Sequence, residues 1–403
     1  MFGKALFGVT LVAAISPVAA RADDLRGFLE VRAGAADGEE SWLEEGFGKT
    51  RFDGGGGGFE ADGLLRGMLI WSPQITWNLD GFVSLQLDTQ MQPALDVGEA
   101  FLSYRGAPSA GWRWEGRAGL FYPPVSLEHE GAGWTTTHTL TPSAINSWVG
   151  EEVRVVGVEG VARRRFDTQE IAATLALFGF NDGSGTLLAA RGWALGDVTP
   201  GLSGELALPW RSFPYQEHTS ITYESDHRVG YYAQVRYRPV GNVNLDLLYY
   251  DNRGDRVSDV DGQTNWETQF WNLGARVALD ANTRLLAQAM SGRTVWGMQT
   301  PMGPWVEVDF HAGYVLLAHE FGRHEVAGRL DYFQIDDQSF AATDNNDEDG
   351  WAATAAYQIE LRPTVRLAIE GLHIASERPA RADQGLEPDQ DQSMLQTSVR
   401  FSF

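Results

Sequence analysis

Apolar and polar side chains alternate along most of this chain. In the final stretch, from Ser393 on, polar residues take every second position, and between them lie Leu395, Thr397, Val399, Phe401 and Phe403. Because successive side chains of an extended strand point to opposite faces, this stretch has one face that suits lipid and one that suits water. The pattern predicts a strand of a transmembrane β-barrel, and the edge strand of a soluble sheet is the alternative.

The alternation recurs in pairs of segments joined by short polar turns. Residues 63–71 and 75–90 form the first clear pair, and Leu85 and Leu87 of the second segment fall on the opposite face from Asp80. Counting every pair predicts about 18 strands, which include residues 186–195 and 202–210 on either side of the turn 197–201. Sixteen strands are the alternative, because the signal from each segment is weak.

The connections are short at one end of the predicted hairpins and long at the other, as in barrels with a periplasmic and an external rim. Such a barrel must close, since an open sheet would leave unpaired backbone amides in hydrocarbon. The predicted fold class is therefore all-β, a transmembrane, antiparallel, up-and-down β-barrel of 16–18 strands. A β-propeller is the soluble alternative, but no blade motif repeats along the chain.

The first residues have the pattern of an export signal. Lys4 provides a positive start, residues 5–15 are apolar, and Ala20-Arg21-Ala22 is a small-residue cleavage site. We therefore predict a signal peptide at residues 1–22 and an outer-membrane barrel domain at residues 23–403. No later segment has the ~18 consecutive apolar residues of a membrane-spanning helix.

Composition agrees with a barrel and argues against other classes. The chain has 46 Gly, 14 Trp, 12 Tyr and 20 Phe, which suit short strands, tight turns and aromatic girdles at two membrane interfaces. A secreted all-β enzyme would share this profile. Without cysteine there is neither a disulfide nor a Cys metal site. The net charge of −23 argues against a nucleic-acid partner, because binding to phosphates depends on clustered positive charge.

Two stretches carry a resemblance to a known family. The run from Arg117 to Glu128, RAGLFYPPVSLE, and residues 149–157 resemble the phosphate-selective porin family of Gram-negative outer membranes. The resemblance implies a third external loop, residues 123–152, that folds inward and narrows the pore. This chain departs from the family's pattern in two ways. Lys49 is the only lysine after Lys4, whereas anion selectivity there is linked to arginines and lysines, and we count one hairpin more than sixteen strands give.

The terminal strand also resembles the closing strand of bacterial outer-membrane barrels, which the barrel assembly machinery recognises. That resemblance makes Phe401 and Phe403 the expected assembly signal.

The predicted constriction combines the inward loop with the strands at its two ends. Acidic groups facing arginines would set a transverse field across the narrowest part and orient charged solutes. The predicted members are Arg113, Glu115, Arg117, Glu128, Glu130, Glu151, Glu152 and Arg154. The charges predicted to line the rest of the pore are Arg66, Asp80, Asp88, Glu99, Arg236, Arg238, Asp246, Arg276, Arg329, Asp331, Arg366, Glu370 and Arg400. The alternative for any one of them is a solvated salt bridge without selective effect.

Metal chemistry has weaker support. Asp344, Asp347 and Asp349 could hold Ca²⁺ on an external loop, but their spacing differs from the known Ca²⁺ loop pattern, and a solvated acidic loop is the alternative. The histidines lack the spacing of a metal site, and no other metal or cofactor is predicted.

The sequence therefore predicts an outer-membrane porin, a water-filled channel for small hydrophilic solutes or ions that an arginine-lined constriction could make anion-preferring. The expected partners are outer-membrane lipid and lipopolysaccharide, the barrel assembly machinery and, by resemblance to porins, further copies of the chain in a homotrimer. Two alternatives stay open. One is an outer-membrane enzyme of the lipase or esterase type, although no Gly-x-Ser-x-Gly motif occurs. The other is a structural barrel or adhesin without an open pore.

Overall fold

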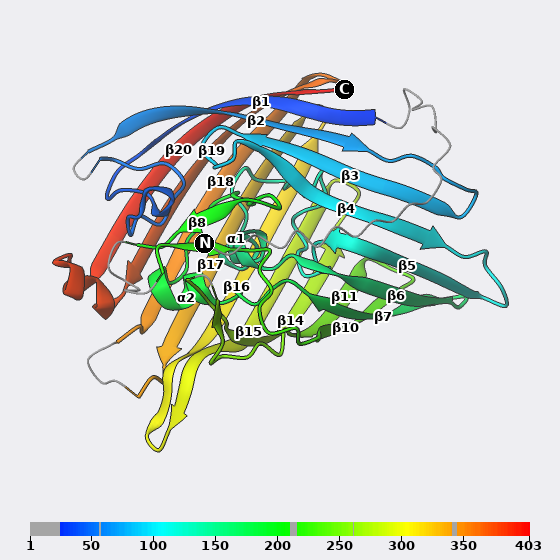
Figure 1. The fold of residues 1–403 in the computed structure, drawn as a ribbon. Coiled ribbons are helices and arrows are strands. Elements are labelled where there is room, and N and C mark those ends of the chain that lie inside the picture. The colour runs from blue at the N-terminus through cyan, green and yellow to red at the C-terminus, as the bar shows by residue number, and fades with distance from the viewer. Residues whose placement is uncertain (1–24, 56–57, 210–215, 261, 341–344) are drawn as a thin grey trace.

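The computed structural model of this chain describes residues 25–55, 58–209, 216–260, 262–340 and 345–403. The predicted signal peptide, residues 1–22, lies outside the described residues. Within them, sixteen strands pair antiparallel with their neighbours in chain order, and the last strand pairs with the first to close a barrel (Figure 1). In this part of the chain no helix has the length and apolar character needed to cross a membrane.

The barrel strands are β1 (Leu25–Ala36), β2 (Glu60–Trp71), β3 (Leu79–Asp88), β4 (Leu95–Arg105), β5 (Trp112–Phe121), β6 (Val155–Arg165), β7 (Gln169–Gly179), β10 (Gly230–Pro239), β11 (Val243–Asp251), β14 (Glu267–Ala278), β15 (Thr283–Thr300), β16 (Gly303–Phe321), β17 (His324–Asp337), β18 (Glu348–Arg362), β19 (Val365–Glu377) and β20 (Asp389–Ser402). The short strands are β8 (Glu205–Ala207), β9 (His218–Ser220), β12 (Asp259–Val260) and β13 (Gln263–Thr264). The helices are α1 (Ala144–Glu152), α2 (Thr186–Arg191) and the 3-10 turns η2 (Trp42–Glu44) and η3 (Pro379–Gln384).

Alternating side chains give the barrel wall an apolar outer face. On β20, Leu395 is 57% exposed and Phe401 is 49% exposed, whereas Gln396 between them is buried. β20 meets β1 with Arg400 opposite Glu30, and Arg400 Nε donates to the Glu30 carboxylate at 2.7 Å. The alternation predicted for the terminal strand is confirmed.

The prediction of 18 strands is wrong, and the alternative of sixteen is confirmed for the described residues. Residues 186–195, predicted as a strand, form α2 and irregular chain. Within residues 202–209, the described part of the other predicted strand, only β8 is extended, in a separate two-stranded sheet with β9. Leu187, Leu188 and Ala189 are all buried, so this segment has no face that alternates toward lipid. A short apolar run suits a buried helix as well as a strand, and its periodicity does not separate the two.

The connections at the two ends of the barrel differ in length, as predicted. Gly322 and Arg323 join β16 to β17, whereas residues 122–154 and 180–229 form long connections at the opposite end. Gly322 has a φ of 69°, in the left-handed region that glycine adopts without steric cost, and this allows so tight a turn.

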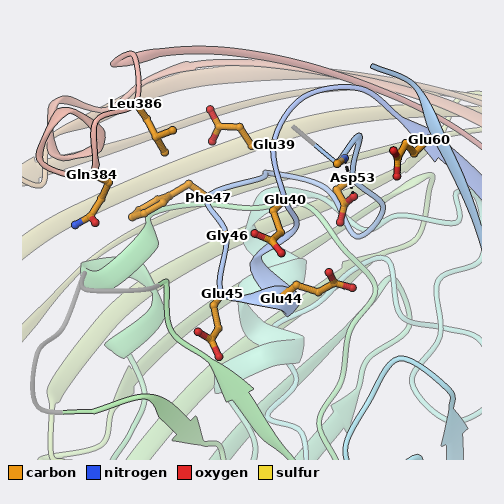
Figure 2. Close-up of a pocket in the computed structure, with 11 residues that line it drawn as sticks. Glu39, Glu40, Glu44, Glu45, Gly46, Phe47, Asp53, Glu60, Gln384 and Leu386 are labelled. Carbon is orange, nitrogen blue, oxygen red and sulfur yellow. Dashed lines mark hydrogen bonds between the residues drawn. The ribbon is translucent and has the colours of Figure 1, made fainter. Parts of the chain in front are cut away.

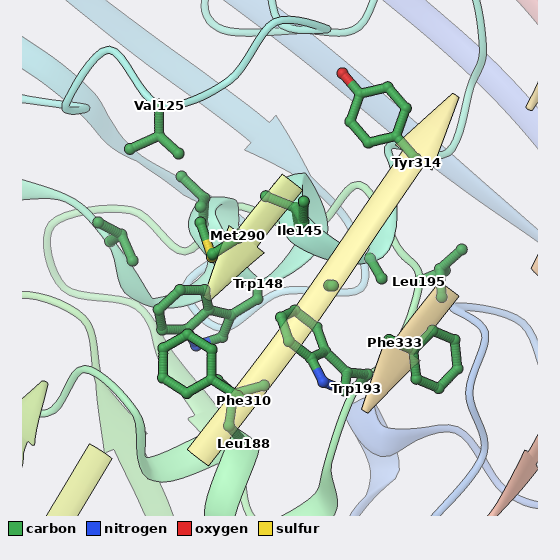
Figure 3. Packing of buried hydrophobic residues seen from close by; sticks show 14 of the residues in the cluster. Val125, Ile145, Trp148, Leu188, Trp193, Leu195, Met290, Phe310, Tyr314 and Phe333 are labelled. Carbon is green, nitrogen blue, oxygen red and sulfur yellow. The ribbon is translucent and has the colours of Figure 1, made fainter. Parts of the chain in front are cut away.

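A hydrophobic core lies between the wall and the long connections (Figure 3). Trp148 of α1 packs edge-on against Trp193, with ring centroids 6.2 Å apart, and its ring lies 5.1 Å from that of Phe310 on β16. α1 also contacts β17, and α2 contacts β16. The connections that carry these helices therefore occupy part of the barrel interior with apolar side chains.

Candidate pore and its constriction

The connection between β5 and β6, residues 122–154, reaches strands on the other side of the barrel. Near its start, the Val125 carbonyl accepts a hydrogen bond from Gln288 on β15 at 3.1 Å. Farther along, the Leu140 amide donates to Glu370 on β19 at 2.5 Å. All of α1, which follows, is buried. Distant strands therefore hold this connection both by its backbone and by its helix.

Glu128 is fixed by a buried arginine of the wall. Arg329 on β17 donates to Glu128 at 3.0 Å, to Asp331 at 2.7 Å and to the Pro142 carbonyl at 2.9 Å. Ser143 Oγ donates to Glu128 at 2.6 Å. Although burial opposes ionisation, Arg329 and these hydrogen bonds lower the pKa of Glu128. Glu128 is thus an ionised anchor for the connection and is not exposed to an open passage.

Glu151 and Glu152, at the end of α1, join the two inner connections. Glu151 accepts a hydrogen bond from Arg191 of α2 at 2.5 Å, and Glu152 accepts from the amides of Gly185 and Leu187, both at 3.0 Å. Burial raises the pKa of each carboxyl to about 7, and the hydrogen bonds offset only part of that rise. Both groups therefore bind α1 to α2, although they were predicted to face the arginines of the constriction.

The predicted arginines of the constriction have partners of their own. Arg117 makes a two-pronged contact with Glu159 on β6, at 2.9 and 3.0 Å. Arg154 is buried and donates to two backbone carbonyls, at 3.0 and 2.6 Å. Arg113 is 49% exposed at its side chain and lies 4.0 Å from Glu115. The structure does not pair these arginines with the predicted loop carboxylates, so their part in selectivity stays a prediction.

Glu130 does contact charged groups of the wall. Its side chain is 56% exposed and lies 3.1 Å from Arg276 on β14, which also contacts Asp246 on β11 at 3.4 Å. Arg236 on β10 donates to Asp246 at 2.6 Å. Loop and wall thus present opposite charges side by side over three strands, an arrangement that can orient a charged solute.

The predicted lining residues all lie on barrel strands, at positions that alternate with lipid-facing ones; they are Arg66, Asp80, Asp88, Glu99, Arg236, Arg238, Asp246, Arg276, Arg329, Asp331, Arg366, Glu370 and Arg400. Many pair with opposite charges, as Arg66 does with Asp88 at 3.4 Å and Asp80 with Arg105 at 2.5 Å. The inner surface is therefore rich in charge but locally neutralised.

An acidic cavity lies in the connection between β1 and β2, and the sequence did not lead us to expect it. The carboxylates that line it are Glu39, Glu40, Glu44, Glu45, Asp53 and Glu60, around a space of about 530 Å³ (Figure 2). Residues 56 and 57 of this connection lie outside the described residues. The closely spaced acidic pairs at 39–40 and 44–45 were the available signal. Like charges gathered in a concave surface raise the local concentration of cations.

The predicted Ca²⁺ ligands are described in part. Asp344 lies outside the described residues, Asp347 accepts a hydrogen bond from the Asp337 amide at 2.7 Å, and Asp349 accepts one from the Tyr332 hydroxyl at 2.5 Å. Binding of Ca²⁺ by these residues stays a prediction.

A second carboxylate group, Asp182, Glu224 and Asp226, was not anticipated. Its ligand atoms lie within 4.8 Å of one another, a spacing that a hard cation can bridge. Burial and the two neighbouring carboxylates raise the pKa of Asp182 to about 6. The Ser225 amide already donates to Asp182 at 2.7 Å, so the connection's own backbone holds this group in place.

Neither a protein-family model nor a curated protein matches this sequence. Solved structures match its fold. The outer membrane channel DcaP of Acinetobacter baumannii aligns with a TM-score of 0.55 at 11% identity, over 94% of this chain and 96% of DcaP. A loop L8 deletion mutant of OmpT, an outer membrane protein of Vibrio cholerae, aligns with a TM-score of 0.53 at 8% identity, over 94% and 99% of the two chains.

An anion-selective porin from Comamonas acidovorans aligns with a TM-score of 0.52 at 12% identity, over 94% of this chain and 98% of that porin. At such identities the likeness concerns the fold. It supports the broader resemblance to porins and does not single out the phosphate-selective family. The described chain is therefore a closed antiparallel β-barrel with a porin-like fold.

Proposed function

We propose that this chain is an outer-membrane porin that conducts small hydrophilic solutes or ions. The observation that carries the proposal is the two-sided wall. On β10 and β11, Val235 and Leu247 are 52% and 44% exposed on the outside, while Arg236 and Asp246 pair on the inside. A wall that is apolar outside and charged inside suits a wet passage through a bilayer.

We further propose that residues 122–154 narrow this passage, as the resemblance to phosphate-selective porins implies. The hydrogen bonds to β15 and β19 and the packing of Trp148 support a fixed obstruction. Solutes would then pass beside it, along the charged groups around Glu130 and Arg276. The scarcity of lysine favours a broad anion preference over a phosphate-specific one.

The same proposal places the barrel in the outer membrane, in contact with lipid and lipopolysaccharide. Assembly as a homotrimer, and delivery by the barrel assembly machinery through Phe401 and Phe403, are expectations that belong to this proposal. Phe403 exchanges backbone hydrogen bonds with Gly27 of β1, both at 3.0 Å, so the proposed signal lies where the barrel closes.

Planar-bilayer recording on the purified protein tests the proposal. We expect discrete conductance steps. Arg117→Ala should shift the reversal potential toward cations, because it leaves Glu159 without its partner, whereas Arg256→Ala, in an external connection, should change it little. Folded protein that gives no steps would contradict the porin and favour a structural barrel, and ester hydrolysis in detergent would favour the enzyme.

A further inference from the structure

Asp197, in the connection between β7 and β10, is bound by three arginines from other parts of the chain. Arg32 lies on β1, Arg66 on β2, and Arg51 in the connection between those strands. The Nη1 atom of each meets the Asp197 carboxylate, at 2.8 Å from Arg32, at 3.0 Å from Arg51 and in a short contact from Arg66. All four side chains are buried. Three cationic donors thus converge on one carboxylate.

The donors are positioned by contacts other than Asp197. Arg32 Nε donates to Glu30 at 3.1 Å, Arg51 donates to Asp88 at 2.5 Å, and Arg66 Nε lies 3.4 Å from Asp88. These contacts use other nitrogens of each guanidinium group, so the three Nη1 atoms stay directed at one point. All three donors therefore have a side-chain contact that does not involve Asp197, and Arg66 Nη2 also donates to the Asp197 backbone carbonyl at 3.2 Å.

Charge in this cluster depends on Asp197. Arg32, Arg51, Arg66 and Arg400 share the carboxylates of Glu30, Asp88 and Asp197. Without Asp197, four arginines would face two carboxylates. Uncompensated charge in a buried cluster lowers the free energy of unfolding. Although burial opposes ionisation, Arg32, Arg66 and Arg51 hold the pKa of Asp197 well below its usual range. The cluster thus requires an anion at this position.

Asp197 reaches the cluster on irregular chain between α2 and β8. On one side the Leu195 amide donates to the Lys49 carbonyl at 2.9 Å, and on the other the Pro200 carbonyl accepts from Arg154 at 2.6 Å. Arg51 also borders a cavity of about 500 Å³, whose lining includes the carboxylates of Glu44, Asp53, Glu60 and Asp62. The three arginines thus come from β1, β2 and the connection between them, whereas the anion comes from the connection between β7 and β10. The cavity borders one of the three arginines, Arg51.

We propose that Arg32, Arg51 and Arg66 form a binding site for the carboxylate of a small solute, which Asp197 occupies from within the chain. This inference rests on the proposed porin function and names a solute class for it. A solute carboxylate offers the same planar pair of oxygens as Asp197 and fits the same guanidinium donors. A tethered group acts at an effective concentration of about millimolar or more, so a solute displaces Asp197 only when it is abundant. Displacement releases the Asp197 side chain from the three arginines, while the backbone contacts of Leu195 and Pro200 keep the connection in place.

The variant Asp197→Asn tests the site, with sodium acetate as the probe. We expect the reversal potential to shift toward anions. We also expect acetate to raise the thermal unfolding midpoint of the detergent-purified variant at roughly tenfold lower concentration than in the wild type, because binding to the folded state stabilises it. Asp255→Asn is the matched control, since it removes the same charge from a more exposed pair with Arg228 at 2.8 Å. It should behave like the wild type in acetate.

Two further variants make the outcome decisive. Adding Arg51→Gln to Asp197→Asn should abolish the acetate effect. If Asp197→Asn does not assemble, the wild type is compared with Arg51→Gln instead. Acetate at high concentration should raise the unfolding midpoint of the wild type, and Arg51→Gln should lose that response. An Asp197→Asn variant that responds to acetate as Asp255→Asn does would overturn the inference. An equal response to inorganic phosphate at the same ionic strength would overturn the assignment to carboxylates. The unfolding measurement needs no current, so failure of the site and failure of the porin proposal are distinguishable.

Discussion

Arg329 shows, at the scale of one residue, how a charge is accommodated inside this barrel. It is 2% exposed, and besides Glu128 and Asp331 it donates to the Thr141 carbonyl at 2.7 Å and to Thr354 Oγ1 at 3.1 Å. A buried ion pair is favourable only when the remaining donors are satisfied as well. Arg329 meets that condition by binding the wall and the connection 122–154 together.

Replacing Arg329 should therefore be costly. Arg329→Met leaves Glu128 and Asp331 buried without their cation, and we expect a loss of about 3–5 kcal/mol in the free energy of unfolding. Arg284→Met removes an exposed arginine that pairs with Glu320 at 2.8 Å, and this control should cost about 0–1 kcal/mol. Denaturant titration of the folded barrel measures both. Equal losses would show that Arg329 does not anchor the connection.

Alternation correctly placed Arg329 and Asp331 on barrel strands between lipid-facing positions, but it did not indicate the contact of Arg329 with Glu128. That partner lies 201 positions away in the sequence. A period of two tells which face of a strand a residue occupies. Pairing across the barrel depends on the path of a connection, and no local pattern encodes that path.

At the scale of elements, α1 has a local signal at its start and none along its length. Ser143 caps it, with its hydroxyl accepting the Asn146 amide at 3.3 Å, as serine commonly does at helix starts. The helix is buried on every side, so it lacks the apolar stripe by which surface helices are recognised. The strands were predictable because each has one face toward lipid and one toward water, which gives an alternating pattern in the sequence.

The joint between α1 and α2 should depend on pH. Burial raises the pKa of Glu151 and Glu152 from 4.5 to about 7, so the folded state favours their protonated form. Their favourable contribution is complete below the unfolded pKa of 4.5 and is lost as pH rises through about 7. We expect amide hydrogen exchange in both helices, corrected for its intrinsic pH dependence, to accelerate between about pH 5 and 8.

The double variant Glu151→Gln with Glu152→Gln should remove most of this pH dependence, because neutral side chains imitate the protonated form. Glu130→Gln is the control, since the Glu130 side chain is 56% exposed. A double variant that keeps the full pH dependence would assign it to other groups.

At the scale of the whole molecule, the wall is a boundary between two solvents. The same substitution at Val158 and at Val161, both on β6, tests which solvent each face of the wall meets. Val158 is 63% exposed on the outer face, while Val161 pairs with Glu115 in the register of β5 and β6. Val158→Arg should cost about 2–4 kcal/mol in lipid, and Val161→Arg, beside an acidic group, less than about 1 kcal/mol. Unfolding titrations in bilayers that show equal costs would contradict the orientation of the wall.

The fold of the molecule was predictable because every strand repeats one physical pattern. The barrel interior was not, since it is assembled from segments that lie far apart in the sequence. Asp197 illustrates this limit. Its neighbours in the chain indicated a simple turn, whereas the structure brings it to Arg32 and Arg66.

Seven of the described tryptophans form two groups that differ in exposure. Trp42, Trp148, Trp193 and Trp266 are at most 2% exposed, whereas Trp114, Trp271 and Trp351 are 61%, 54% and 47% exposed on the wall. Brominated acyl chains can reach the wall indoles and quench their fluorescence, while the enclosed indoles continue to emit. The residual emission would then report on the packing of the inner connections, independently of the lipid that surrounds the barrel.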